Sequence, residues 1–285
     1  MNFELLNHID LNEYLVKEIT DLADNDEVGI LHCRDLLLNG DLNKLAKKSS
    51  VMKLAATLKA AEITHKKYIK KQISDEIFYN TFSDIKIWCE NCNNKGLENI
   101  NWLKNHINFE LFKIGRFQYQ LFKLNNPRLN YNKLPVSYGE NVIYVHIPQG
   151  EKLDYNACLN SLSLSNIFFN KYFSEFNYNY YFCESWLLFD GNKFFMDKDS
   201  NILKFAGLFN VHYSINDEKQ EFERIFGFDK NIRKIERRRR LYKNKSDINR
   251  LPEFTSLQKN AKEYLINNGR FGEGIGTIPK SKYIK

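Results

Sequence analysis

The chain has 285 residues, 43 % of them hydrophobic and 14 % aromatic, which suffices for two domains with full hydrophobic cores. No apolar run reaches the roughly 18 residues that a transmembrane helix needs, and the acidic N-terminal segment lacks the basic start of a signal peptide. Five cysteines, an odd number, fit a reducing compartment better than a disulfide framework. We therefore expect a cytoplasmic protein with no membrane partner.

The formal net charge of +7 is concentrated in one segment. Residues 228–245 hold nine Lys and Arg against two acidic residues, an excess that equals that of the whole chain. A protein that coats nucleic acid spreads its basic residues more widely. The distribution therefore argues against nucleic acid as the main partner.

Residues 10–107 are predicted to be almost entirely helical. Four candidate N-caps each precede a segment of helical apolar spacing: Asp10, Asp26, Asp41 and Ser74. No proline precedes Pro127, so nothing in this part of the sequence breaks a helix. We predict a helical N-terminal domain over residues 1–107. The alternative is a helical extension of a single domain.

Residues 109–121 change to the shorter period of strands, with a turn or bulge at Gly115-Arg116. Residues 142–147 then form a β-branched and aromatic run that predicts a buried strand, which Pro148 and Gly150 end. Asp154 is the candidate N-cap of the next helix, and a second strand is predicted over residues 180–189. This order predicts a βαβ unit, in which the loop and the helix N-terminus offer backbone N–H groups to an anion.

The remainder alternates between helices and strands. A helix is predicted from Ser200, and strands are predicted over residues 210–215 and 272–278. Three further helices are predicted over residues 218–226, 231–242 and 253–268.

Five blocks between Trp102 and Phe205, in this order, carry a family resemblance: WLKNH, LFKIGRFQYQ, VHIPQG, CESWLL and SNILKF. The ordered set resembles the bacterial acyltransferases with a GNAT-like C-terminal domain. The resemblance implies an α/β (α+β) fold, with a helical N-terminal domain followed over residues 108–285 by a GNAT-like mixed sheet flanked by helices. It also implies an acyl-CoA-dependent N-acyltransferase that moves an acyl group to an amine by direct attack.

The ligands follow from the same resemblance. The co-substrate would be acyl-CoA or acetyl-CoA, or an acyl-carrier protein as the donor partner, and the acceptor a small-molecule or peptide amine. No metal is expected, because the only closely spaced thiol pair, Cys89 and Cys92, has no second ligand pair nearby. The glycine-rich pyrophosphate signature of GNAT enzymes is absent after Ile147, where PQGEKL stands.

Two residues are candidates for catalysis. Glu184 lies in an otherwise apolar strand, where a carboxylate is costly to bury unless it is paired or functional, and it is the first choice for the base that deprotonates the amine. The alternative is a structural ion pair, for example with Arg116. His146, at the end of the first core strand, is a second candidate base, or else a structural residue that orients the loop.

Two sets of residues are candidates for binding. The cofactor set combines the loop after the first core strand with the basic segment: Ile147, Gln149, Gly150, Arg237 and Arg238. The substrate set combines Arg116, at the predicted turn, with three residues of the second core strand: Tyr181, Ser185 and Trp186. The missing signature supports an alternative function, a non-catalytic GNAT-like module that binds a protein or nucleic acid through the basic segment 230–245.

Overall fold

The computed structural model describes residues 1–227, 230–242 and 247–283. The chain divides into two compact units. Unit 1 comprises Met1–Phe122, Val145–Lys152 and Asn160–Asn177, and unit 2 comprises Lys123–Tyr144, Leu153–Leu159 and Tyr178–Lys285. The predicted domain boundary at residue 107 stays a prediction.

Unit 1 begins with helices. Their bounds are α1 (Glu13–Asn25), α2 (Glu27–Leu38), α3 (Leu42–Leu45), α4 (Ser50–Lys70), α5 (Asp75–Phe82), α6 (Asp84–Asn91) and α7 (Ile100–Ile107). The longest, α4, packs against α1 and α2, and its alanines at 55, 56, 60 and 61 are fully buried. Small side chains on α4 let neighbouring helices approach closely, so this helix is the centre of the helical part.

The helix starts only partly follow the predicted caps. Asp26 caps α2 as predicted, with its side chain accepting from the Gly29 N–H (2.9 Å). Asn12 rather than Asp10 caps α1, and the long helix predicted from Asp41 begins at Ser50 with Ser49 as its cap. Each of these short polar side chains satisfies a backbone N–H that the first helical turn leaves unpaired.

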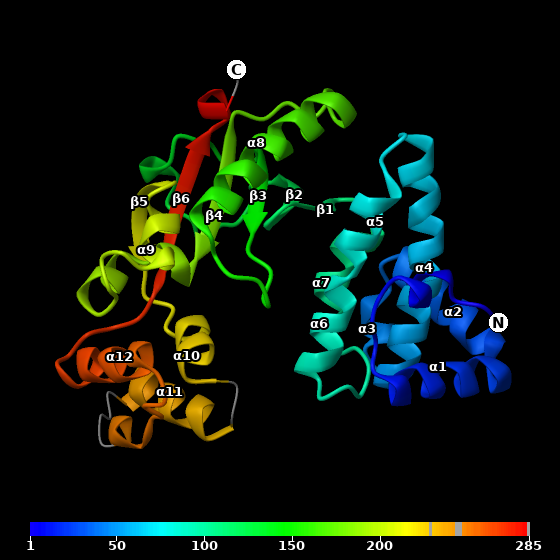
Figure 1. Cartoon of the computed structure of the whole chain (residues 1–285), viewed down its shortest axis with the longest axis horizontal. Helices are drawn as coiled ribbons and strands as arrows, with labels where there is room; N and C mark the ends of the chain where they lie inside the picture. The colour runs from blue at the N-terminus through cyan, green and yellow to red at the C-terminus, as the bar shows by residue number, and fades with distance from the viewer. Residues whose placement is uncertain (228–229, 243–246, 284–285) are drawn as a thin grey trace. The chain divides into compact units, whose positions relative to one another are not determined.

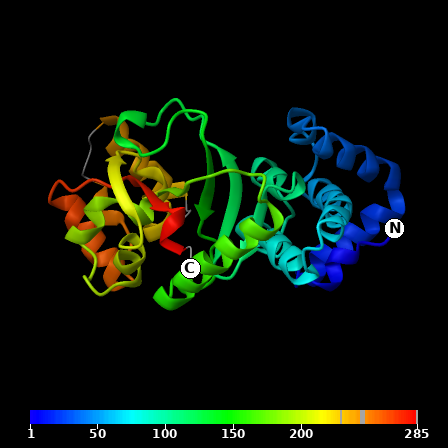
Figure 2. The ribbon, with the colours of Figure 1, turned by 90° about the horizontal axis from the view of Figure 1, so that it is seen from above.

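Six strands form one mixed sheet in the order β1-β2-β3-β4-β6-β5. Their bounds are β1 (Leu111–Ile114), β2 (Phe117–Lys123), β3 (Asn141–His146), β4 (Tyr180–Ser185), β5 (Asn210–Ile215) and β6 (Glu273–Pro279). β3 and β4 are parallel, and β6 runs antiparallel to both of its neighbours, β4 and β5. Figures 1 and 2 show β5 beside β6, in yellow and red. The α/β fold class is therefore confirmed.

The predicted strand–helix–strand unit is also confirmed. The helix α8 (Tyr155–Tyr172) connects β3 to β4, and the Asp154 carboxylate accepts from the Ala157 N–H (2.8 Å) as its N-cap. The second strand is shorter than predicted. It ends at Ser185, whose Oγ accepts from the Leu187 N–H (3.2 Å) and so caps a 3₁₀ turn over Trp186–Leu188.

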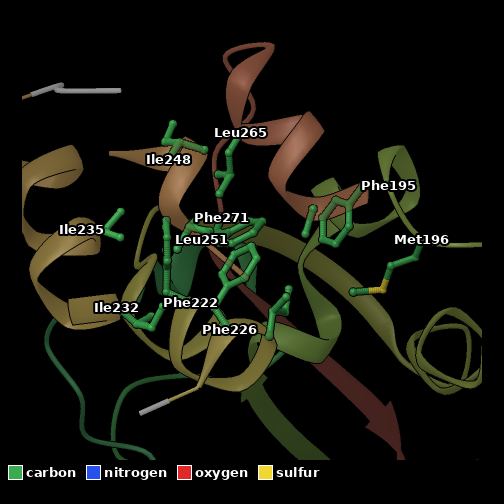
Figure 3. Packing of buried hydrophobic residues seen from close by; sticks show 12 residues of the cluster. Phe195, Met196, Phe222, Phe226, Ile232, Ile235, Ile248, Leu251, Leu265 and Phe271 are labelled. Carbon is green, nitrogen blue, oxygen red and sulfur yellow. The ribbon is translucent and has the colours of Figure 1, made fainter. Parts of the chain in front are cut away.

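Four helices complete unit 2: α9 (Asn201–Ala206), α10 (Lys219–Phe226), α11 (Lys230–Tyr242) and α12 (Ser256–Ile266). Side chains of α10, α11 and α12 pack around Phe271, just before β6, in the apolar cluster of Figure 3. Phe222 and Phe271 are fully buried in it, with ring centroids 5.0 Å apart. The cluster holds these helices at the N-terminal end of β6.

Candidate active site

The strand registers place two carboxylates on one face of the sheet in unit 2. Glu184 on β4 lies opposite Ile275 on β6, and Glu273 lies two residues before Ile275. Side chains two residues apart on a strand point to the same face, so Glu184 and Glu273 are diagonal neighbours on that face. Both are half-buried.

Aromatic side chains share this face. Tyr213 on β5 also lies opposite Ile275, and Tyr144 on β3 lies opposite Phe182, two residues before Glu184. The Tyr144 hydroxyl donates to the Glu184 carbonyl (3.4 Å), and the Tyr213 hydroxyl accepts from the Asn130 N–H (2.8 Å). We call Tyr144, Glu184, Tyr213 and Glu273, with Asp217 just beyond β5, the acidic face.

Burial and neighbouring carboxylates raise the pKa of both Glu184 and Glu273. Burial raises the pKa of Glu184, and the Asp217 charge adds to this effect while Arg128 opposes it. Burial, Asp217 and Glu184 together raise the pKa of Glu273 to about 7. Like charges held together in a partly desolvated site favour uptake of a proton or of a cation. The face can therefore exchange a proton near neutral pH and attract an ammonium group.

Glu273 and Asp217 were not among the residues predicted from the sequence. Glu273 lies in a glycine-rich segment that predicts only a strand, and Asp217 lies in a short loop after β5. The antiparallel register of β6 with β4 joins Glu273 to Glu184, and Asp217 follows β5, which pairs with the other edge of β6. That register pairs residues far apart in sequence.

Two predicted substrate residues do not share the acidic face. Tyr181 and Ser185 alternate with Glu184 along β4, so their side chains point to the opposite face. Tyr181 is fully buried and its hydroxyl lies 3.3 Å from that of Tyr178. This arrangement argues against a shared pocket of Tyr181, Ser185 and Glu184. Trp186 packs against the apolar cluster of Figure 3.

His146 lies beside a buried polar network in unit 1. Its Nε2 is 3.0 Å from Gln120 Oε1, and its ring meets that of Trp102 edge-on at 4.8 Å. The Trp102 and Trp88 indoles both donate to Asp84 Oδ2, at 2.6 and 3.0 Å. These contacts fix Trp102 against the imidazole of His146.

Asp84 remains ionised within this network. Burial raises the pKa of Asp84, but His106 and the two indoles outweigh burial and hold that pKa below its usual value. The Nε2 atom of His106 lies 3.2 Å from Asp84 Oδ2. Both His106 ring nitrogens lack a well-aligned hydrogen bond among the described residues. The charge of Asp84 is therefore stabilised mainly by the indole N–H groups and by the closeness of the His106 ring.

Burial lowers the pKa of His146 to about 3, with Asp84 and His106 acting on it in opposite directions. A general base works best when its pKa lies near the operating pH, so an imidazole this weakly basic takes up a proton poorly. The structure thus argues against His146 as a general base. Its alternative role, orienting the loop, stays a prediction.

The loop after β3 contains the predicted cofactor residues. Ile147 is half-buried, whereas Gln149 and Gly150 are exposed. Gly150 has φ +98°, and no atom lies within 4 Å of the place where a Cβ would stand, so the glycine is required by the backbone dihedral and not by crowding. Asp154 occupies one of the α8 amides that an anion at this helix terminus would use.

Arg116 is placed differently from the prediction. Its side chain is buried, and its guanidinium donates to three carbonyl oxygens of the loop after β3, those of Pro148, Glu151 and Lys152. The predicted role of Arg116 in direct contact with substrate has no support in this geometry.

The arginines of α11 have distinct environments. Arg237 is exposed, and Arg238 donates to Asp247 (2.7 Å). Arg239 is only 8 % exposed and lies 3.5 Å from Glu218, so this arginine is not on the solvated side of α11. Residues 243–245 of the predicted basic segment lie outside the described residues.

A groove of about 500 Å³ runs between α10 and α11. It is lined by Lys219, Phe222, Glu223, Ile232, Arg233, Glu236 and Arg237. Within the described part of the chain, no group of three or more His, Cys, Asp or Glu residues is arranged to hold a metal ion. Among the helices that the structure describes, none has the length and apolar character to span a bilayer.

The fold defines an acyltransferase of the GNAT-like class. Residues 111–278 match the family model of the GNAT-like C-terminal domain, and residues 4–109 match that of the N-acyltransferase N-terminal domain. The chain belongs to the family with this GNAT-like C-terminal domain, and we describe it as an enzyme rather than as a non-catalytic binding module. A comparison with curated proteins found no match.

Solved acyltransferases share the fold at low identity. One, in complex with decanoyl-CoA and teicoplanin, is 17 % identical with a TM-score of 0.75, over 97 % of this chain and 86 % of that chain. Another, in complex with CoA and 10C-teicoplanin, is 16 % identical with a TM-score of 0.75, over 97 % and 86 % of the two chains. A third, in complex with decanoyl-CoA, is 18 % identical with a TM-score of 0.72, over 96 % and 86 %. At these identities the comparison establishes the shared fold.

Proposed function

We propose that this protein is an acyl-CoA-dependent N-acyltransferase whose amine acceptor binds at the acidic face. This proposal rests on the pair Glu184 and Glu273, which lie on one half-buried face because of the register of β4 with β6. An amine substrate is a cation at neutral pH and must lose a proton before it can attack a thioester. Adjacent carboxylates serve both needs, because they attract the ammonium and can accept its proton.

The chemistry then needs no covalent enzyme intermediate. A carboxylate of the acidic face takes one proton from the ammonium, directly or through a water molecule. The free amine attacks the thioester carbonyl, the C–N bond forms, and the C–S bond breaks. The second proton of the nitrogen leaves with the collapse of the tetrahedral intermediate, and the CoA thiolate is protonated. Catalysis rests on proximity and on the base.

The loop after β3 is the proposed site of the donor phosphates. It precedes α8 in the confirmed strand–helix–strand unit, and because Asp154 already accepts from the Ala157 N–H, we assign the phosphates to the backbone N–H groups of the loop itself. Solved acyltransferases of the same fold hold CoA or decanoyl-CoA, which supports acyl-CoA as the donor. An acyl-carrier protein as donor partner also remains within the proposal.

The acceptor is proposed to be a small-molecule or peptide amine. Two of the solved acyltransferases hold teicoplanin or 10C-teicoplanin, which supports an acceptor larger than a simple amine. A panel of amines and amine-bearing peptides, tested with acyl-CoAs from acetyl to decanoyl, would identify the pair by release of free CoA thiol. If no pair gives turnover and CoA does not bind, the proposal is wrong.

Substitutions on the acidic face test the role of its carboxylates. We expect both Glu184→Gln and Glu273→Gln to fold and to bind CoA as wild type does. The variant that replaces the catalytic base should lower kcat by ~10²–10⁴-fold. The matched control is Glu263→Gln, an exposed carboxylate on α12, which should leave kcat unchanged. Wild-type turnover in both Glu184→Gln and Glu273→Gln would refute the assignment.

The pH profile separates the two carboxylates. Because the pKa of Glu273 is raised to about 7, kcat/KM should rise as the pH increases through 7, when Glu273 loses its proton and can accept one from the amine. This inflection should disappear in Glu273→Gln. An unchanged profile in that variant would assign the inflection to another group.

A further inference from the structure

Arg116 is a buried cation that binds backbone instead of ligand. Nε donates to Lys152 O (2.9 Å), Nη1 to Pro148 O (3.1 Å) and Nη2 to Glu151 O (2.8 Å). The residue is only 6 % exposed. All three nitrogens of the guanidinium thus bind carbonyls of residues 148–152, within the loop after β3.

The turn that carries Arg116 is itself held in place. The Ser161 hydroxyl of α8 donates to the Ile114 carbonyl, and its oxygen accepts from the Phe117 N–H (3.1 Å). The turn between β1 and β2 is therefore tied to α8 on both sides of Arg116. Gly115, with φ +61°, allows the tight reversal, and a Cβ there would stand 3.3 Å from Ser161.

The carbonyl contacts orient the loop amides. In a planar trans peptide the C=O and N–H groups point in opposite directions. Since the Pro148 and Glu151 carbonyls face the guanidinium, the N–H groups of Gln149 and Lys152 point away from it. A loop with N–H groups turned outward presents the groups that bind phosphate.

We infer that Arg116 is a positioning residue that fixes the loop 148–152 in the conformation that receives the phosphates of the acyl donor. The inference rests on the proposed function, because that function supplies the donor. It assigns Arg116 a role that differs from direct phosphate binding, because the guanidinium is buried and each of its three nitrogens donates to a carbonyl of the loop. A lysine cannot replace it, because a single ammonium does not match three carbonyls as the rigid guanidinium fork does.

The chain offers a matched control for this inference. Lys113 on β1 forms an ion pair with Glu151, so it also joins the hairpin to the loop. The Lys113 side chain is 19 % exposed and that of Glu151 49 %, so solvent reaches the carboxylate and screens the pair. Lys113→Gln removes a cation from the same place without removing any carbonyl contact.

The experiment measures the affinity for CoA and for pantetheine, which lacks the phosphates. We expect Arg116→Lys to raise the Kd for CoA about tenfold or more, which corresponds to ~1.4 kcal/mol, with kcat at saturating donor within about threefold of wild type. Lys113→Gln should change the Kd for CoA less than about twofold. The affinity for pantetheine should be the same in all three proteins.

NMR order parameters of the backbone amides of residues 149–152 give a readout that does not need activity. They should be lower in Arg116→Lys than in wild type and Lys113→Gln, because the loop loses the guanidinium that fixes its carbonyls. If CoA binds to none of the three proteins but this difference is found, the proposed donor fails and the positioning role stands. Unchanged order parameters and unchanged Kd for CoA in a folded Arg116→Lys protein would overturn the inference. An equal loss of CoA and pantetheine would overturn it too.

If Arg116→Lys does not fold, Ser161→Ala provides the second variant. It releases the turn that carries Arg116 while leaving the guanidinium in the chain. We expect it to weaken CoA binding and to lower the order parameters of the loop amides. Wild-type values of both quantities in Ser161→Ala would contradict the inference.

Discussion

Replacement of Glu221 should stabilise the protein at neutral and alkaline pH. Glu221 on α10 is fully buried, and its Oε2 accepts from the Gly272 N–H (2.8 Å), beside Glu273 of the acidic face. Its Oε1 has no hydrogen-bond partner among the described residues. Burial, with the charges of Glu218 and Glu273, raises the pKa of Glu221 from 4.5 to about 9.

The sign of the effect follows from this shift. The folded protein keeps Glu221 protonated, whereas the unfolded chain ionises it above its ordinary pKa. The stabilisation is therefore full below pH 4.5 and is lost progressively as the pH rises towards 9. Each pH unit in this window costs ~1.4 kcal/mol, so roughly 2–4 kcal/mol is lost between about pH 5 and 8.

Glu221→Gln removes this loss, since glutamine does not titrate and can still accept from the Gly272 N–H. The difference in Tm between Glu221→Gln and wild type should grow by roughly 5–15 °C between about pH 5 and 8, at ~2–4 °C per kcal/mol. Thermal unfolding followed by circular dichroism at several pH values measures it, with the exposed Glu263→Gln as control. A difference in Tm that stays constant with pH would refute the reasoning, because it would mean that Glu221 is not protonated in the folded state.

Two further predictions use matched pairs. Trp102→Phe and Trp88→Phe each remove an indole donor to Asp84, so both should lower the free energy of unfolding by ~1.5–3 kcal/mol. Only Trp102→Phe should also shift the imidazole NMR signals of His146, because only Trp102 contacts that ring. A shift of equal size in both variants would contradict the contact. Arg239→Gln should destabilise the protein by ~1–3 kcal/mol, because it removes the cation that lies 3.5 Å from buried Glu218. The exposed Arg237→Gln should stay within ~0.5 kcal/mol, and equal Tm values for the two variants would show that burial does not distinguish them.

The elements that the sequence predicts well are those whose signal is local. The β-branched run before Pro148 became β3, and the alternating segment 210–215 became β5 within the same bounds. The N-cap at Asp154 was also predicted, because a carboxylate three residues before a backbone N–H is a local geometry. Periodicity and capping chemistry depend on neighbours along the chain, so one sequence suffices for them.

The acidic face was predictable only in part. Glu184 stands out in the sequence because it is an ionisable residue within an apolar strand. No local pattern connects it to Glu273, which becomes its neighbour only when β4 pairs with β6. The same limit explains Tyr181 and Ser185, which lie next to Glu184 in sequence and on the opposite face of the strand. The sequence does not single out Arg239, because a run of arginines gives no indication of which side chain meets a buried carboxylate.

The missing glycine signature and the buried Arg116 can be explained together. A glycine-rich loop can turn its amides towards a phosphate because glycine has little steric preference, but an unrestrained loop of this kind loses conformational entropy when it binds. In this chain the loop after β3 carries one glycine, Gly150, and its Pro148, Glu151 and Lys152 carbonyls are fixed by a guanidinium from another hairpin. Fixing carbonyls on one side orients amides on the other without further glycines. A loop pre-organised in this way would bind the donor phosphates with a smaller entropic cost, which is why its affinity for CoA should depend on a residue that never touches the ligand.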